Sequence, residues 1–395
     1  MKPENWFPLL IVALLIGAFF NQPLIVIISM SGIAVIGLAQ LWKLFSLEGV
    51  TYRRRWRYRR GFPGETTMLR IEVENNKLLP LSWLKISDPW PLAVPPEENQ
   101  ILSPSHIPGQ GILVNIYSLR WFERITRPYK LVFKQRGVYP VGPAEIQSGD
   151  LFGLYEKKLK QGSTDRLTVY PELIPFSSLQ LPADDPFGDR QSRRRLFVDP
   201  SRPIGVRPYH PEDDFRSVHW SATARTGSLQ VKVHQPVSSK VVVVCLNITT
   251  TSLPIYGARI EIMEQMIKIC ATLVHKAYQD GYAVGMVSNG CMAHADQPLR
   301  ISPGRSPSQP AHLLQALAAV TPYTTNAFET FLYKSMPHIP YGATLLIVTA
   351  LVPPNLCEAI LRLKRYRSFT TLISLDETTP PDLPGIRTVH LPFEA

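Results

Sequence analysis

An uncharged apolar stretch near the N-terminus constrains this chain more than any other feature. Residues 24–42, LIVIISMSGIAVIGLAQLW, carry no charged side chain and are about long enough to cross a hydrocarbon core as a helix. A shorter apolar run, residues 6–20, precedes it, and the Asn-Gln-Pro break between the two favours a tight turn. Neither run is followed by the small-residue cleavage site of a removed signal peptide. We therefore predict a transmembrane helical hairpin over residues 1–50.

Arginines interleaved with aromatic residues follow the apolar segment, in YRRRWRYRR within residues 51–60. Positive charge beside a membrane helix stays in the cytoplasm, and it also attracts anionic lipid headgroups. This basic juxtamembrane segment predicts a multi-pass protein of the inner (cytoplasmic) membrane with its soluble domains in the cytoplasm. If the first run does not span, the short N-terminus lies outside instead. The residues expected to face lipid are Arg53, Arg54, Arg55, Arg57, Arg59 and Arg60.

The same arginines raise the alternative that the protein binds lipid or nucleic acid through its basic clusters. Their juxtamembrane position already accounts for the charge, so no specific nucleic-acid partner is expected.

Residues 61–175 have the pattern of an all-β domain. In residues 66–75, TTMLRIEVEN, apolar Leu69, Ile71 and Val73 alternate with Arg70 and Glu72. Similar runs recur between Gly-, Pro-, Asn- and Asp-containing breaks, which is typical of short antiparallel strands and predicts a β-sandwich.

Residues 240–395 have the pattern of an α/β domain, and residues 176–239 link it to the β-rich part. Residues 240–248, KVVVVCLNI, are apolar without alternation, as in a central strand buried on both faces. Residues 257–279 then show helical spacing, and further strands and helices alternate after them. This order predicts a doubly wound, mainly parallel sheet. The chain contains no GxxxxGKS, GxGxxG or GxSxG motif in a suitable context.

Ligands of such sheets bind at the carboxyl ends of strands. Asn247, Thr249 and Thr251 follow the first strand with a spacing that resembles the Asp-x-Ser-x-Ser metal loop of von Willebrand factor type A domains. This resemblance implies a type A-like fold. An amide replaces the carboxylate, and residues 349–351, Thr-Ala-Leu, stand where that family has Thr-Asp-Gly. Because Mg²⁺ normally takes a carboxylate ligand, we expect a degenerate site without a cofactor; a Mg²⁺- or Mn²⁺-dependent binder or enzyme is the alternative.

The segment YHPEDDFRSVHWSATARTGSL, residues 209–229, concentrates charged and aromatic residues. It resembles the signature of a bacterial and archaeal family, domain of unknown function 58, which runs Arg-x-Tyr-x-Pro-Gly-Asp-Asp, then Arg and Trp, then Ala-Arg-x-Gly-x-Leu. Glu212 replaces the usual glycine. The matching residues are Arg207, Tyr209, Pro211, Asp213, Asp214, Arg216, Trp220, Ala224, Arg225, Gly227 and Leu229.

The resemblance implies a membrane-anchored protein with a degenerate type A-like domain. Members of this family are often encoded beside MoxR-type AAA+ ATPases. A non-enzymatic adaptor or scaffold is therefore expected, working with such an ATPase in assembly, stress response or envelope maintenance. The substrate, if any, is not indicated.

Three hypotheses account for the charges of the signature. In the first, Arg207, Arg216 and Arg225 form a clamp on Asp213 and Asp214, since the planar guanidinium suits carboxylates. In the second, the two carboxylates act in catalysis with a nearby histidine, although no nucleophile has a placed base. In the third, the segment is a docking surface for a partner. We favour the clamp and assign no catalytic residue.

The signature also predicts a short helix. Either aspartate can cap its start, and Gly227 can end it. Helical spacing then places Phe215, Val218, His219 and Ala222 on its buried side, so His219 is expected to face a core.

Overall fold

The structure is a computed structural model, and it divides the chain into unit 1, Met1–Tyr170, and unit 2, Pro171–Ala395. It describes all residues except 1–5, 99–101, 151–152, 183–186, 188–197, 212, 237–239, 252–257, 294, 341, 365–368 and 394–395.

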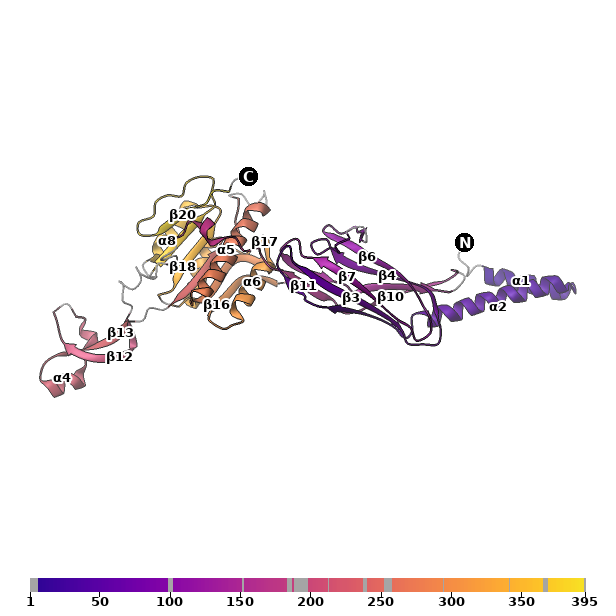
Figure 1. Cartoon of the computed structure of the whole chain (residues 1–395), viewed down its shortest axis with the longest axis horizontal. Coiled ribbons are helices and arrows are strands. Elements are labelled where there is room, and N and C mark those ends of the chain that lie inside the picture. The colour runs from indigo at the N-terminus through magenta and orange to yellow at the C-terminus, as the bar shows by residue number, and fades with distance from the viewer. Residues whose placement is uncertain are drawn as a thin grey trace. The chain divides into compact units, whose positions relative to one another are not determined.

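Unit 1 begins with a pair of apolar helices, α1 (Trp6–Phe19) and α2 (Pro23–Ser46), which lie side by side in Figure 1. The pair confirms the predicted apolar helices. The 24 residues of α2 are long and apolar enough to cross a membrane, whereas α1 is shorter. Glycines allow the close approach, because a Cβ on Gly17 would stand 2.9 Å from Cγ2 of Ile25.

The rest of unit 1 is built from strands around one apolar core. The predicted alternation is present in β3, where Leu69, Ile71 and Val73 are fully buried. The sheets have the orders β1-β3-β7, β10-β9-β4-β6-β5 and β2-β11-β8. The strands are β1 (Val50–Trp56), β2 (Arg60–Gly61), β3 (Thr66–Asn75), β4 (Leu81–Pro91), β5 (Leu102–Pro104), β6 (Gln110–Leu119), β7 (Arg124–Val132), β8 (Gly137–Val141), β9 (Ala144–Gly149), β10 (Glu156–Gln161) and β11 (Asp165–Val169).

Unit 2 contains a mixed sheet of order β16-β15-β14-β18-β19-β20, and β17 also pairs with β15. The pairs β14–β15, β14–β18, β18–β19 and β19–β20 are parallel, whereas β16 and β17 run antiparallel to β15. The sheet strands are β14 (Val241–Leu246), β15 (Ala283–Met292), β16 (Ala295–Gly304), β17 (Val320–Thr324), β18 (Thr344–Thr349), β19 (Phe369–Ser374) and β20 (Arg387–His390).

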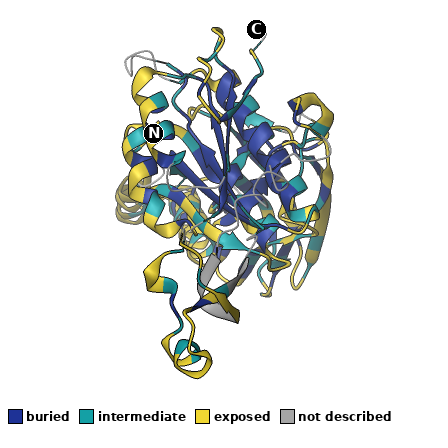
Figure 2. Ribbon diagram, turned by 90° about the vertical axis from the view of Figure 1, so that its left-hand side faces the viewer, coloured by how far each residue is buried: buried dark blue, intermediate teal, exposed yellow. Residues whose placement is uncertain are grey.

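Helices cover this sheet, and Figure 2 shows its strands as a buried interior. Because both faces of β14 are covered, Val242, Val243 and Val244 are at most 1% exposed, as the unbroken apolar run predicts. Helices α7 and α8 share a core cluster with Val243, whereas α5 and α6 contact one another. The helices of this part are η3 (Phe176–Leu179), α5 (Ile260–Gln279), α6 (Gln309–Ala319), α7 (Phe328–Ser335), η6 (Met336–His338) and α8 (Pro354–Lys364).

The signature lies in a small antiparallel hairpin of unit 2, which we call the signature hairpin. Strands β12 (Val198–Pro208) and β13 (Gln230–Pro236) pair, and η4 (Phe215–Ser217) and α4 (Trp220–Thr226) lie between them. Glu212, the departure from the family signature, lies outside the described residues. The predicted single helix is thus a 3₁₀ turn followed by a short α-helix.

Candidate functional site: the signature hairpin, the strand-end loop and the arginine network

One ion pair dominates the signature hairpin. Arg207 donates two hydrogen bonds to Asp213, from NH1 to Oδ2 at 2.7 Å and from NH2 to Oδ1 at 2.5 Å. The backbone N–H of His210 also donates to Asp213 Oδ2, at 2.8 Å. These bonds from Arg207 and His210 hold the pKa of Asp213 below its usual value. Arg207 and Asp213 therefore fix the turn that leaves β12.

The other charges of the signature take different roles. Asp214 caps η4, because its Oδ1 accepts a hydrogen bond of 3.0 Å from the backbone N–H of Arg216. Asp214, Arg216 and Arg225 are exposed. Within the described part of the chain, no ion pair joins Arg216 or Arg225 to either aspartate. The clamp thus consists of Arg207 and Asp213 alone, and the aspartates are not buried together with Arg225.

His219 is a helix cap rather than a core residue. Its Nδ1 accepts a hydrogen bond from the backbone N–H of Ala222 at 3.1 Å, and lies 3.0 Å from the hydroxyl of Ser221. The imidazole is half-buried at the start of α4. Gly227 ends α4 with φ 68°, which confirms the predicted C-cap. His219 is therefore engaged in capping, and Asp214 lies in a separate cap.

Aromatic side chains of the signature are exposed next to these charges. Phe215 is 57% exposed and Trp220 is 63% exposed. Ring centroids lie 6.0 Å apart for Tyr209 and Phe215, and 6.1 Å apart for Phe215 and Trp220. The prediction that Phe215 is buried is wrong, because the chain leaves helical geometry at Val218, with ψ 132°, and the helical spacing is broken there. We call Tyr209, Phe215 and Trp220 the aromatic row.

The loop that follows β14, which contains Asn247, Thr249 and Thr251, is closed by amide and hydroxyl groups; we call it the strand-end loop. Asn247, which follows β14, is 4% exposed and donates from Nδ2 to Thr349 Oγ1 at 3.0 Å. Its Oδ1 accepts from the backbone N–H of Thr249 and from Nδ2 of Asn289, both at 3.1 Å. Asn289 comes from β15 and is fully buried. The ends of three parallel strands are thereby tied together by neutral groups.

This arrangement does not fit a divalent cation. The Oδ1 atom of Asn247 already accepts two hydrogen bonds, and the Nδ2 groups of both asparagines place N–H donors where a cation would need oxygen ligands. The described residues hold no group of three His, Cys, Asp or Glu side chains that could ligate a metal. Thr249 and Thr251, the other two predicted ligands, line a cavity of about 440 Å³ together with Tyr323.

No sequence pattern singled out Asn289. Its signal was weak, because a polar residue near the end of a buried strand has many possible partners. What makes it important is that the carboxyl ends of β14 and β15 meet at one edge of the sheet, and only the fold shows which strands are neighbours.

The arginines after α2 form a second cluster, which runs along strand β1 and through the connection from β1 to β2. The Arg54 side chain is 2% exposed and donates to Asp88 from Nε at 2.7 Å and from NH2 at 2.8 Å. Its NH1 lies 3.3 Å from Asp165 Oδ2, and the hydroxyl of Tyr52 donates to Asp88 at 2.7 Å. The prediction that Arg54 faces lipid is therefore wrong: strand alternation turns its side chain inward, where two carboxylates neutralise it.

Burial affects the titration of this network. Burial raises the pKa of Tyr52 far above its usual value, and the charge of Asp88 adds to the effect. Burial alone would lower the pKa of Arg54, but hydrogen bonding and attraction to Asp88 outweigh it and raise the pKa. Both groups therefore keep their protons over the accessible pH range.

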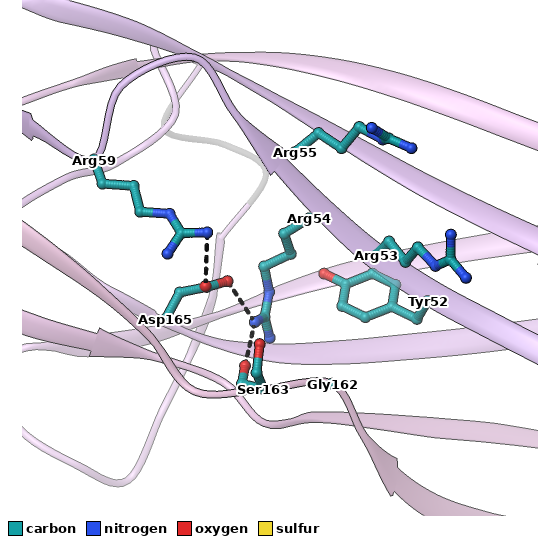
Figure 3. Close-up of a pocket in the computed structure, with 8 residues that line it drawn as sticks. All are labelled: Tyr52, Arg53, Arg54, Arg55, Arg59, Gly162, Ser163 and Asp165. Carbon is teal, nitrogen blue, oxygen red and sulfur yellow. Dashed lines mark hydrogen bonds and ion pairs between the residues drawn. The ribbon is translucent and has the colours of Figure 1, made fainter.

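Figure 3 shows the neighbouring arginines around a cavity of about 490 Å³. Arg59 and Arg54 point toward Asp165, with 3.4 Å between Arg59 NH2 and Asp165 Oδ1. Arg55 pairs with Glu72 at 2.7 Å and is 62% exposed. Arg53, Arg57, Arg59 and Arg60 are exposed as well.

Together these features define a multidomain protein with an apolar N-terminal helix pair, a β-rich unit and a mixed α/β unit. Residues 205–391 match the family described as "Protein of unknown function DUF58", so this part of the chain belongs to that family, as its signature indicates.

A curated relative supports the same assignment. The chain is 26% identical over 180 residues to the "Uncharacterized protein YeaD" of Bacillus subtilis (strain 168), covering 43% of this chain. The chain covers 41% of the length of that relative.

Among solved structures, similar chains include the CARDB domain of the PF1109 protein from Pyrococcus furiosus. It has 12% identity and a TM-score of 0.21, covering 30% of this chain and 91% of that one. A cohesin module of a family 33 glycoside hydrolase from Clostridium perfringens has the same identity and TM-score, covering 30% and 97%. At these scores, neither similarity supports a conclusion about function.

Proposed function

We propose that this protein is a membrane-anchored adaptor that holds two cytosolic domains at the inner membrane and docks a protein partner through its signature hairpin. In this proposal α1 and α2 form a multi-pass anchor, the strands of unit 1 form a β-sandwich, and the sheet of unit 2 is a degenerate type A-like domain. The partner is a MoxR-type AAA+ ATPase, which the family resemblance implies.

The exposed aromatic row carries the docking part of the proposal. Exposed Phe and Trp side chains beside arginine are the composition of protein–protein hot spots. Phe215 and Trp220 are more than half exposed, and Arg216 and Arg225 are exposed on the same small hairpin. The side chains that would serve catalysis are occupied instead, because Asp213 pairs with Arg207 and His219 caps α4.

The strand-end loop supports a role without a metal. In Mg²⁺-dependent type A domains this edge of the sheet is where oxygen ligands gather. Here the Asn247 side chain accepts a hydrogen bond from Asn289 and donates one to Thr349. The loop is therefore a structural tie between strands.

Orientation in the membrane follows from charge. The arginines of residues 53–60 come after α2, and positive charge beside a spanning helix stays in the cytoplasm. This supports a cytoplasmic location for the strands of unit 1 and for unit 2, whether or not α1 also spans.

Affinity purification from the native membrane tests the proposal. The full chain is solubilised in mild detergent and compared with the double variant Phe215→Ser/Trp220→Ser. The matched control is Tyr323→Ser, another aromatic of unit 2, which is 72% exposed in β17. We expect the wild type and the control to retain an AAA+ ATPase and the double variant to lose it. Retention by all three would exclude the aromatic row, and absence of any ATPase with the wild type would exclude the partner.

A further inference from the structure

The loop between β3 and β4, residues 76–80, is bonded to the chain that leaves α2. The backbone N–H of Asn76 donates to the Gly49 carbonyl at 2.8 Å. The Lys77 ammonium donates to the carbonyl of Ser46, the last residue of α2, and to the carbonyl of Glu48 at 2.6 Å. Leu47, the residue after α2, is 4% exposed and belongs to the core of the strands. No flexible linker therefore separates α2 from this loop.

A second set of contacts joins the strands to the last turns of α2. Tyr155, which is 5% exposed, packs against Ala39 and accepts a hydrogen bond from Gln40 Nε2 at 3.1 Å. Lys157 of β10 donates to the Leu44 carbonyl at 2.8 Å. The strand-rich part of unit 1 is thus fixed alongside the last turns of α2. Figure 1 shows α2 extending from one end of these strands.

The loop between β6 and β7, residues 120–123, lies beside the first loop. The backbone N–H of Phe122 donates to the Lys77 carbonyl at 3.3 Å. The Asn75 side chain ties the loops together by donating to the carbonyls of Leu79 and Arg120, at 3.0 and 2.9 Å. We call residues 76–80 and 120–123 the end loops.

The end loops expose large apolar side chains toward solvent. Leu78 is 76% exposed, and Trp121 and Phe122 are each 64% exposed. Phe122 also has φ 52°, a left-handed conformation that is costly for a bulky residue. This backbone strain holds the Phe122 ring outside the core, where it contributes no burial to folding. A contact between this ring and another apolar surface explains the arrangement better than folding of the chain does.

We infer that the end loops insert into the headgroup region of the bilayer that α2 crosses. The inference rests on the proposal that α2 is a membrane anchor. The 24 residues of α2 extend about 36 Å, which exceeds the roughly 30 Å of a hydrocarbon core, so its last turn emerges at the interface. The end loops are bonded to the residues that follow that turn.

The chemistry of the end loops fits this environment. Trp is enriched at the headgroup level, where its ring is partly in hydrocarbon and partly hydrated. Lys157 lies at the same end, where its ammonium group can meet lipid phosphates once the membrane is present. The occupant of the exposed apolar surface is therefore lipid, and the β-rich part of unit 1 rests directly on the membrane.

Quenching of tryptophan emission by brominated lipid tests this inference in the full chain, reconstituted in nanodiscs. The contribution of Trp121 is the difference between the wild type and Trp121→Phe, which keeps an aromatic ring. The contribution of Trp42, in α2, is obtained in the same way from Trp42→Phe. The matched control is Ile107→Trp, because Ile107 is 56% exposed before the start of β6, whereas Trp121 follows its end. The ten residues of β6 separate the two sites by about 34 Å.

We expect Trp42 and Trp121 to lose emission in discs of lipid brominated near the headgroup, and the added tryptophan of Ile107→Trp to keep it. Loss for Trp42 without loss for Trp121 would overturn the inference and leave the anchor intact. Loss for neither would refute the anchor, and the insertion with it. Equal loss at all three positions would show nonspecific contact and would also overturn the inference.

Discussion

Replacing Asp88 by alanine removes a carboxylate that accepts three short hydrogen bonds inside unit 1. Two come from Arg54, at 2.7 and 2.8 Å, and one from the hydroxyl of Tyr52, at 2.7 Å. The side chains of Arg54 and Asp88 are 2% and 1% exposed. After the substitution, Asp165, at 3.3 Å, is the remaining carboxylate that pairs with this guanidinium among the described residues.

The expected cost follows from this burial. Removing one partner of a buried ion pair costs about 3–5 kcal/mol, because the other charge stays desolvated and uncompensated. A domain is typically stable by roughly 5–15 kcal/mol, so the loss is a large fraction of the total. With a urea m-value of about 2 kcal/mol per molar, the midpoint of unit 1 unfolding should fall by roughly 2 M.

Urea unfolding followed by tryptophan emission measures this change, since six of the seven tryptophans lie in unit 1. The matched control is Glu74→Ala, which breaks the pair with Arg124, whose side chain is 58% exposed. Such exposed pairs contribute about 0–1 kcal/mol. The double variant Arg54→Met/Asp88→Leu should recover much of the loss, because it leaves no unpaired charge. A midpoint for Asp88→Ala equal to that of Glu74→Ala would refute the reasoning.

Three further outcomes are expected. Asn247→Asp removes the donor to Thr349 and buries a carboxylate, so it should destabilise unit 2 by about 1–3 kcal/mol in thermal unfolding. Millimolar Mg²⁺ should leave the Tm of the wild type unchanged. Burial lowers the pKa of Lys77 to about 8, below the value of about 10.4 in an unfolded chain, so the unfolded state binds more protons between these values. Stability should therefore rise from pH 8 to pH 10, relative to Lys77→Met, and a flat difference between the two proteins would contradict this. Asp213→Ala should change stability by less than about 1 kcal/mol, because Arg207 is 44% exposed; a larger loss in urea unfolding would mean that the hairpin depends on this pair.

Local patterns predicted the elements that one continuous stretch of sequence specifies. The uncharged run at residues 24–42 became α2, Pro23–Ser46, because a helix satisfies its backbone internally and needs no distant partner. The alternation around Leu69, Ile71 and Val73 became β3. The signature at residues 209–229 identified the family because it is a contiguous motif that can be read without knowing the fold.

The fates of single side chains were predicted less well. Phe215 was expected to be buried because helical spacing was extended through Val218, where the backbone in fact becomes extended. His219 was expected in a core, but its Nδ1 can cap a helix equally well once α4 begins at Trp220. Such choices depend on one or two dihedral angles, which residue spacing does not encode.

The sequence by itself determined an apolar helix pair, a β-rich part, an α/β part and a family, because these depend on periodicity and on contiguous motifs. The tertiary structure decided which charges are buried and which apolar groups are exposed. Arg54 became a core residue because Asp88 and Asp165, which are 34 and 111 positions away, converge on it. Trp121 and Phe122 came to lie beside the end of α2 because strand pairing brings distant loops to one end of a sheet, and no local pattern specifies that neighbour.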